Sequence, residues 1–199
     1  MSALTSGGST DGPQDATPST GTVSSRRVFD GRVVTLNVDQ VRFPDGRIGE
    51  QEILRHSGAS VVVPFLSDPH GEDPQLLLVR QYRYATNGYL YELPAGRPNA
   101  GETPAECAAR ELREETGCVA EHLEPLASGY TTPGFTDEKL HLFVAYGITR
   151  HETQFDPDEF VEAYPVTMSK ALEMVRSGEI EDLKTGYGIL FVAGFYCRG

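Results

Sequence analysis

Residues 96–118 read GRPNAGETPAECAARELREETGC, and this stretch decides more about the fold than any other part of the chain. Thr103 followed by Pro104 and Glu106 is a helix start, because a hydroxyl caps the first turn, proline suits the first helical position and the glutamate closes a capping box. Gly117 supplies the stop, since glycine readily adopts the left-handed conformation that ends a helix. The sequence therefore predicts a helix between Thr103 and Gly117.

The predicted helix has an apolar face and an acidic edge. At about 100° per residue, we expect one set of side chains to pack inward: Ala105, Ala108, Ala109, Leu112 and Thr116. Glu111 and Glu115 lie one turn apart beside that face, with Glu114 on their flank, and such close carboxylates repel one another. A positive group is therefore expected among them, either Arg110 and Arg113 on a solvated surface or a bound cation. Carboxylates without a Cys or His pair are hard oxygen ligands, which suit Mg²⁺ or Mn²⁺ rather than zinc.

The whole spacing resembles the Nudix box: Gly96, Glu102, the run Arg110-Glu111-Leu112, the pair Glu114-Glu115, and Gly117. Cys118 stands where an aliphatic residue is usual, which is an apolar replacement. The resemblance covers about residues 57–198 and implies an α+β fold, a Nudix-type α/β/α sandwich with a mixed sheet. It also implies hydrolysis of a small nucleoside diphosphate compound with Mg²⁺, or alternatively Mn²⁺, as cofactor.

The same resemblance implies roles for individual residues. Glu111 and Glu115 would be the principal metal ligands and catalytic residues, with Glu114 and the carbonyl of Ala95 completing the set. Glu102 and Arg110 would hold the loop to the helix and orient the ligands.

The chain resembles the ADP-ribose pyrophosphatase branch of the family in three further sequence features: the segment 91–96 (YELPAG), the segment 79–83 (VRQYR), and Pro133, 16 residues beyond Gly117. This branch implies hydrolysis of ADP-ribose to AMP and ribose 5-phosphate. Its substrate-binding positions correspond here to Arg55, Arg83, Pro133 and Gly134. Two alternatives stay open: another nucleoside diphosphate sugar, such as GDP-mannose or ADP-glucose, and a non-catalytic ligand sensor. The sensor would be unusual, because every acidic position of the box is present and no basic helix-turn-helix segment is visible.

In that branch the general base comes from an acidic loop after the core strands, and residues 158–162 (DEFVE) are the matching segment. Glu159 is the expected base, and three alternatives remain: Asp158, Glu152 and Glu162. The chain has no Trp, so the aromatic partner of the adenine ring is open, with Phe29 and Phe43 as candidates.

Composition narrows the function classes. Residues 1–24 are rich in Ser, Thr, Gly and Pro and predict a disordered tail without the features of a secretory signal. No run of about 20 apolar residues could span a bilayer, and three cysteines without CxxC spacing indicate reduced thiols. We therefore expect a cytoplasmic protein without a membrane partner. A net charge of −12 also disfavours binding to nucleic acid.

The remaining pattern predicts an N-terminal β segment at 25–56 and a Nudix domain at 57–199. The segment is expected to contain two strands, at 32–43 and 51–56, on either side of the turn Phe43–Gly46, and the first of them is rich in β-branched residues. The domain is expected to contain strands at 59–65, 75–81, 124–130 and 140–146, a helix from about Ser169 to Gly178 with Leu172 and Val175 inward, and a last helix at 184–195. A hairpin this small is not stable alone. In the branch it resembles, such a segment completes a partner's substrate pocket, so we expect a homodimer with Arg55 close to the shared site.

Overall fold

The computed structural model describes residues 20–150 and 161–197. Contacts divide the chain into two compact units, the first ending at Leu54 and the second beginning at Arg55. In the described ranges, no helix has the length and apolar character needed to cross a membrane.

The first unit is a three-stranded sheet in the order β1 (Gly21–Asp30), β2 (Thr35–Arg42) and β3 (Ile48–Arg55). The predicted turn between β2 and β3 is confirmed, because the Gly46 amide donates to the Phe43 carbonyl at 2.9 Å and Gly46 has a φ of 84°. Strand β1 was not predicted, and it begins inside the predicted tail at 1–24. Every residue of β1 is exposed, so the strand lacks the alternation of buried and exposed positions that identifies a strand. Residues 1–19 of that tail lie outside the described residues.

The second unit contains two sheets. The first is mixed: β4 (Ala59–Pro64) runs parallel to β9 (Lys139–Arg150), and β7 (Ala95–Gly96) and β8 (Cys118–Tyr130) pair antiparallel at its two edges. The second sheet is antiparallel, in the order β10 (Val161–Thr167), β5 (Gln75–Arg83) and β6 (Gly88–Glu92). A bridge between Phe65 and Leu76 links the sheets beyond β4. The predicted mixed sheet is thus confirmed, with β8 and β9 longer than expected.

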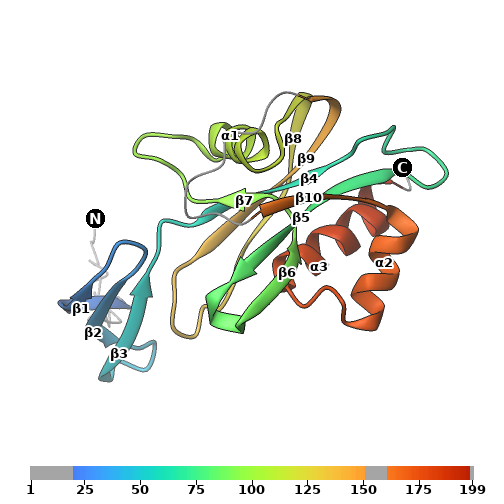
Figure 1. The fold of residues 1–199 in the computed structure, drawn as a ribbon. Helices are drawn as coiled ribbons and strands as arrows, with labels where there is room; N and C mark the ends of the chain where they lie inside the picture. The colour runs from blue at the N-terminus through green and yellow to red at the C-terminus, as the bar shows by residue number, and fades with distance from the viewer. Residues whose placement is uncertain (1–19, 151–160, 198–199) are drawn as a thin grey trace, which may run out of the picture. The chain divides into compact units, whose positions relative to one another are not determined.

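Helices cover both faces of the second unit. Figure 1 shows α1 (Pro104–Thr116) on one side of the strands, with α2 (Met168–Ser177) and α3 (Leu183–Phe191) on the other. Strand β4 alternates accordingly: Val61 and Val63 pack in the core on the α2 and α3 side, whereas Val62 packs with Ala108 and Leu112 of α1. The predicted α/β/α sandwich is therefore confirmed, and the apolar run 61–63 of its central strand is buried on both faces.

The C-terminal helices follow the prediction in part. Thr167 caps α2, and Gly178 ends it with a φ of 80°. Leu172 and Val175 are only half-buried, because the innermost positions of α2 are Met168, Ala171 and Met174. The last predicted helix is divided, since α3 ends at Phe191 and a π-helical turn follows at Val192–Tyr196. The Cys197 amide donates to the Val192 carbonyl at 2.8 Å, five residues back, which is the π-helical spacing.

Candidate active site

Helix α1 begins and ends where its sequence predicts. Thr103 accepts a hydrogen bond from the Glu106 amide, and the Glu106 carboxylate accepts one from the Thr103 amide at 2.8 Å, so the capping box is complete. Gly117 ends the helix with a φ of 67°. These local interactions fix both ends of the helix that carries the three clustered glutamates.

The inward face of α1 differs from the predicted one. Ala105 and Ala109 are exposed, while Cys107, Ala108 and Leu112 are buried. Glu111 and Glu115 belong to the buried stripe as well, with 9% and 3% of their surfaces exposed. The reason lies in the packing partners, because α1 lies against β7 as well as β4 and β8. The short strand β7 covers the side of the helix that carries the carboxylates.

The strand β7 is fitted closely to these carboxylates. The Ala95 amide donates to Oε2 of Glu115 at 3.1 Å. A Cβ atom at Gly96 would lie 2.0 Å from Oε1 of Glu111, far inside van der Waals contact. The Gly96 carbonyl accepts a hydrogen bond from the Cys107 thiol at 3.4 Å. Glycine is therefore needed at position 96 because the Glu111 carboxylate occupies the space of a side chain.

Arg110 is the positive group among the carboxylates of α1. Its Nε and Nη2 donate to the two oxygens of Glu102 at 2.8 and 2.9 Å, and its Nη1 donates to Glu111 at 2.7 Å and Glu114 at 2.9 Å. Nη2 also donates to the carbonyl of Arg97 at 2.9 Å. The Glu102 hydrogen bond is the largest cause of the raised pKa of Arg110, and it lowers the pKa of Glu102. Glu102 and Arg110 therefore join the loop to the helix through a bidentate ion pair, while their role in orienting metal ligands stays a prediction.

The chemistry of this edge fits a hard divalent cation. In the part of the chain that the structure describes, no group of three or more His, Cys, Asp or Glu side chains is already arranged to hold a metal ion. The donors are nonetheless the ones that Mg²⁺ prefers, since carboxylates on two successive turns of α1 lie beside the backbone of β7 in a space that Gly96 leaves open. Arg110 contacts both Glu111 and Glu114 through its Nη1 atom. The ligand roles of Ala95, Glu111, Glu114 and Glu115 remain a prediction.

Arg83, a predicted phosphate-binding residue, ends strand β5 in an ion pair with Glu92 on β6. Its Nε and Nη2 donate to the two oxygens of Glu92 at 2.7 and 2.8 Å. The Glu92 side chain is only 2% exposed. Burial alone would raise the pKa of Glu92, but the hydrogen bonds and charges of Arg83 and Lys184 outweigh it, so the pKa falls below its ordinary value. Arg83 is thus held in one orientation by a buried carboxylate.

The other predicted substrate residues lie on and beside the loop 131–138. Arg55 donates to Oδ2 of Asp137 at 3.0 Å, and the amide of His56 donates to Oδ1 at 2.8 Å. Pro133 and Gly134 are exposed near the middle of this loop, in a turn closed by the Phe135 amide on the Thr132 carbonyl at 3.1 Å. The structure therefore links Arg55 to the loop through Asp137, while substrate binding by these residues stays a prediction.

The expected general base, Glu159, and its alternatives Asp158 and Glu152 lie outside the described residues. Glu162 lies in strand β10, where its carboxylate pairs with Arg80 at 3.5 Å. The proposed adenine partners belong to the first unit: Phe29 is 58% exposed in β1, and Phe43 is half-buried after β2.

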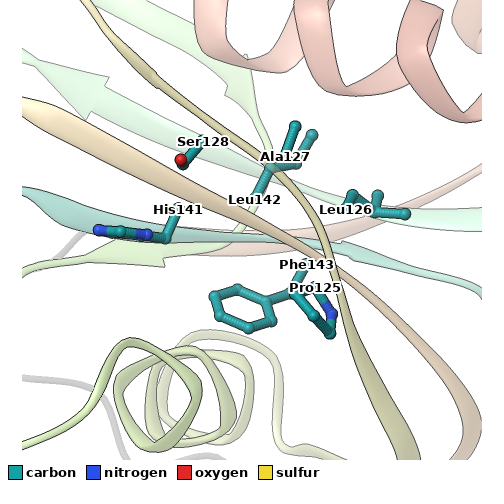
Figure 2. Close-up of a pocket in the computed structure, with 7 residues that line it drawn as sticks. All are labelled: Pro125, Leu126, Ala127, Ser128, His141, Leu142 and Phe143. Carbon is teal, nitrogen blue, oxygen red and sulfur yellow. The ribbon is translucent and has the colours of Figure 1, made fainter.

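A hollow of about 280 Å³ lies elsewhere in the second unit, where β8 bulges between Pro125 and Ala127 against β9. Figure 2 shows Pro125 and Phe143 projecting toward α1, with Ala127 and Leu142 toward the opposite face. The remaining lining residues are Leu126, Ser128 and His141. None of the predicted site residues lines this hollow, so we assign it no part in the reaction.

Sequence analysis missed two features of the site. Glu92 is one of them: a single acid between the apolar residues Leu90 and Leu93 predicts a buried carboxylate that needs a cation. Cys107 is the other, and its contact with Gly96 has no signature in the sequence spacing.

The comparisons with known proteins agree with this architecture. Residues 56–182 match the model of the NUDIX domain, and residues 22–50 match the model described as the nucleoside diphosphate sugar hydrolase N-terminal domain. The first match covers more than half of the chain and includes α1, β7 and the Arg83–Glu92 pair. The chain belongs to the Nudix family and is a Nudix hydrolase.

Individual relatives narrow the comparison. The chain is 36% identical to the ADP-ribose pyrophosphatase of Bacillus subtilis (strain 168), over 86% of this chain and 91% of that protein. It is 37% identical to the ADP-ribose pyrophosphatase of Mycobacterium tuberculosis (strain ATCC 25618 / H37Rv), over 86% of this chain and 82% of the relative. A crystal structure of an ADP compounds hydrolase superposes with a TM-score of 0.74 at 20% identity, covering 90% of this chain and 95% of the other. That structure supports the fold alone.

Proposed function

We propose that the protein hydrolyses the diphosphate of ADP-ribose, in a reaction that requires Mg²⁺, and releases AMP and ribose 5-phosphate. The observation that carries the chemistry is the placement of Glu111 and Glu115 against the glycine-containing strand β7. The two relatives that are ADP-ribose pyrophosphatases support the choice of substrate.

In the proposed reaction, a water oxygen forms a bond to one phosphorus atom and the bond from that phosphorus to the bridging oxygen breaks. The metal would be held by Glu111, Glu115, Glu114 and the Ala95 carbonyl, where it would neutralise diphosphate charge and acidify the attacking water. Arg83, fixed by Glu92, and Arg55 would bind the phosphates, and Pro133 and Gly134 would also contact the substrate. Glu159 would accept the proton of the water. Glu102 and Arg110 would keep the loop before α1 in place.

A panel of nucleoside diphosphate compounds tests the substrate. We expect a higher kcat/KM for ADP-ribose than for ADP-glucose, GDP-mannose, NADH or dinucleoside polyphosphates, and little turnover without Mg²⁺. Coupling to a phosphatase measures the reaction, because the products are phosphate monoesters and the intact diphosphate diester is not a phosphatase substrate. A clear preference for GDP-mannose would replace the substrate and keep the chemistry, whereas a lack of turnover on every compound would favour a ligand sensor.

We also propose a homodimer in the cytoplasm, formed through the first unit. Four apolar side chains on strands β1 and β3 of this unit are about half exposed: Val23, Val28, Phe29 and Ile48. A second copy that covers them would remove this surface from water and would bring its own Arg55 toward the shared site.

Light scattering tests the assembly. The full chain should have twice the chain mass of 21.7 kDa, and Val28→Asp in β1 should weaken the dimer at least about tenfold, since a buried unpaired charge opposes association. Val33→Asp is the matched control, because Val33 is similarly exposed but lies between the strands. A monomeric wild-type protein with full activity would contradict the proposal.

A further inference from the structure

The Glu92 carboxylate is held from two sides. Arg83 binds both of its oxygens from strand β5. Lys184, near the start of helix α3, donates to Oε2 from the other side. Lys184 is itself largely buried, with 18% of its side chain exposed. One buried anion is therefore shared by two cations from distant parts of the chain.

The start of α3 is tied to the same segment by further hydrogen bonds. Asp182 caps the helix and accepts from Nζ of Lys184 at 2.8 Å and from the Thr185 hydroxyl at 2.6 Å. The Thr185 hydroxyl in turn accepts from the Leu93 amide at 2.7 Å. Glu92 and Leu93 are consecutive, so α3 holds both the side chain of one and the backbone of the other.

This segment leads directly into the site. Pro94 follows Leu93 and accepts from the Val62 amide at 2.9 Å. The next residue, Ala95, donates to Glu115. Lys184 thus contacts Arg83 through Glu92, and the backbone beside the proposed metal ligands begins three residues after Glu92.

The positive charge of Lys184 also affects how strongly Arg83 attracts an anion. Two cations and two carboxylates make the cluster neutral as a whole: Arg83 pairs with Glu92, while Lys184 pairs with both Glu92 and Asp182. If Lys184 were absent, Arg83 alone would compensate Glu92, and its attraction for a further anion would be weaker. Because Arg83 uses Nε and Nη2 for Glu92, the Nη1 side of its planar guanidinium faces away from that carboxylate.

We propose that Lys184 is a positioning residue for diphosphate binding: it shares the buried Glu92 carboxylate, which keeps Arg83 oriented and electropositive toward the substrate. The proposal rests on the proposed function, in that it takes the substrate to be a nucleoside diphosphate bound at Arg83. Lys184 itself does not contact the reacting atoms.

Kinetics of Lys184→Met provide the first test, with ADP-ribose as substrate. We expect KM to rise about tenfold or more while kcat falls less than about threefold, because a phosphate contact present in both ground and transition states acts mainly on KM. Lys184→Arg keeps the charge and should restore KM to within about threefold of wild type. Lys170→Met is the matched control, since Lys170 lies on the neighbouring helix and pairs with Glu179 at the surface at 3.4 Å. An unchanged KM in Lys184→Met would overturn the proposal.

A titration with inorganic pyrophosphate and Mg²⁺ provides a second test that does not depend on turnover. The Nε–H resonance of Arg83, assigned by its loss in Arg83→Lys, should shift on titration, with a midpoint about tenfold higher in Lys184→Met. The double variant Asp182→Asn/Lys184→Met removes one charge of each sign and serves if the single variant does not fold; its midpoint should be raised similarly. Equal midpoints in all proteins, or no shift at Arg83 in the wild type, would overturn the proposal. Failure of the proposed function is a separate result, namely a wild-type protein that hydrolyses no compound of the panel.

Discussion

Replacing Glu111 or Glu115 by glutamine is expected to lower kcat by about 10²- to 10³-fold, the usual loss when a charge-stabilising group is removed from a transition state. Each replacement exchanges one carboxylate oxygen for an amide and keeps the size of the side chain. The proposed cation would then be held less tightly or displaced from the diphosphate. Activity at saturating Mg²⁺, together with Mg²⁺ affinity by calorimetry, measures both consequences.

The structure also predicts what these variants do to stability. In the absence of metal, Arg110 already compensates Glu111 through the bond from Nη1, so Glu111→Gln should not raise the melting temperature. A glutamine oxygen can still accept from Arg110 or from the Ala95 amide, and the fold should therefore persist. The matched control is Glu106→Gln on the same helix, because glutamine closes a capping box as glutamate does. Near wild-type activity in both Glu111→Gln and Glu115→Gln would contradict the metal assignment.

The parts of the fold that the sequence predicted correctly are those set by local chemistry. The bounds of α1 follow from Thr103, Pro104, Glu106 and Gly117, which all act within one turn of a helix end. The turn at Gly46 is equally local. Strand β1 was missed for the complementary reason, because an exposed edge strand has no buried face and depends on pairing with β2.

The parts of the site that could not be predicted depend on packing between distant segments. The phase of α1 was displaced toward Glu111 and Glu115 because β7, eight residues before the helix, covers that side. Lys184 lies 92 residues from Glu92 along the chain, and no spacing rule links a lysine at the start of one helix to a glutamate at the end of a strand. A lone acid in an apolar strand predicts only that some cation must approach it.

The requirement for glycine at position 96 leads to the second large expected effect. Gly96→Ala should lower kcat at least about 10²-fold while changing stability little. The atoms that the new methyl group would meet are the end of the flexible Glu111 side chain, at 2.0 to 2.6 Å, so the carboxylate can move aside without disturbing the backbone. Gly96 is not among the described glycines with positive φ, and alanine therefore suits its backbone conformation. The substitution acts by displacing a proposed metal ligand.

Thermal unfolding and steady-state kinetics of Gly96→Ala separate these effects, with Gly129→Ala as the matched control, because a Cβ at Gly129 meets nothing within 4 Å. The double variant Gly96→Ala/Glu111→Gln shows whether the new methyl group lowers activity by displacing Glu111. If the methyl group acts only through Glu111, the double variant should lose no more activity than Glu111→Gln alone, since two changes that remove one interaction are not additive. Additive losses would instead mean that alanine acts on the backbone of β7, where the Cys107 thiol binds the Gly96 carbonyl. The cycle therefore distinguishes a glycine that makes room for a catalytic carboxylate from one that shapes the strand beside it.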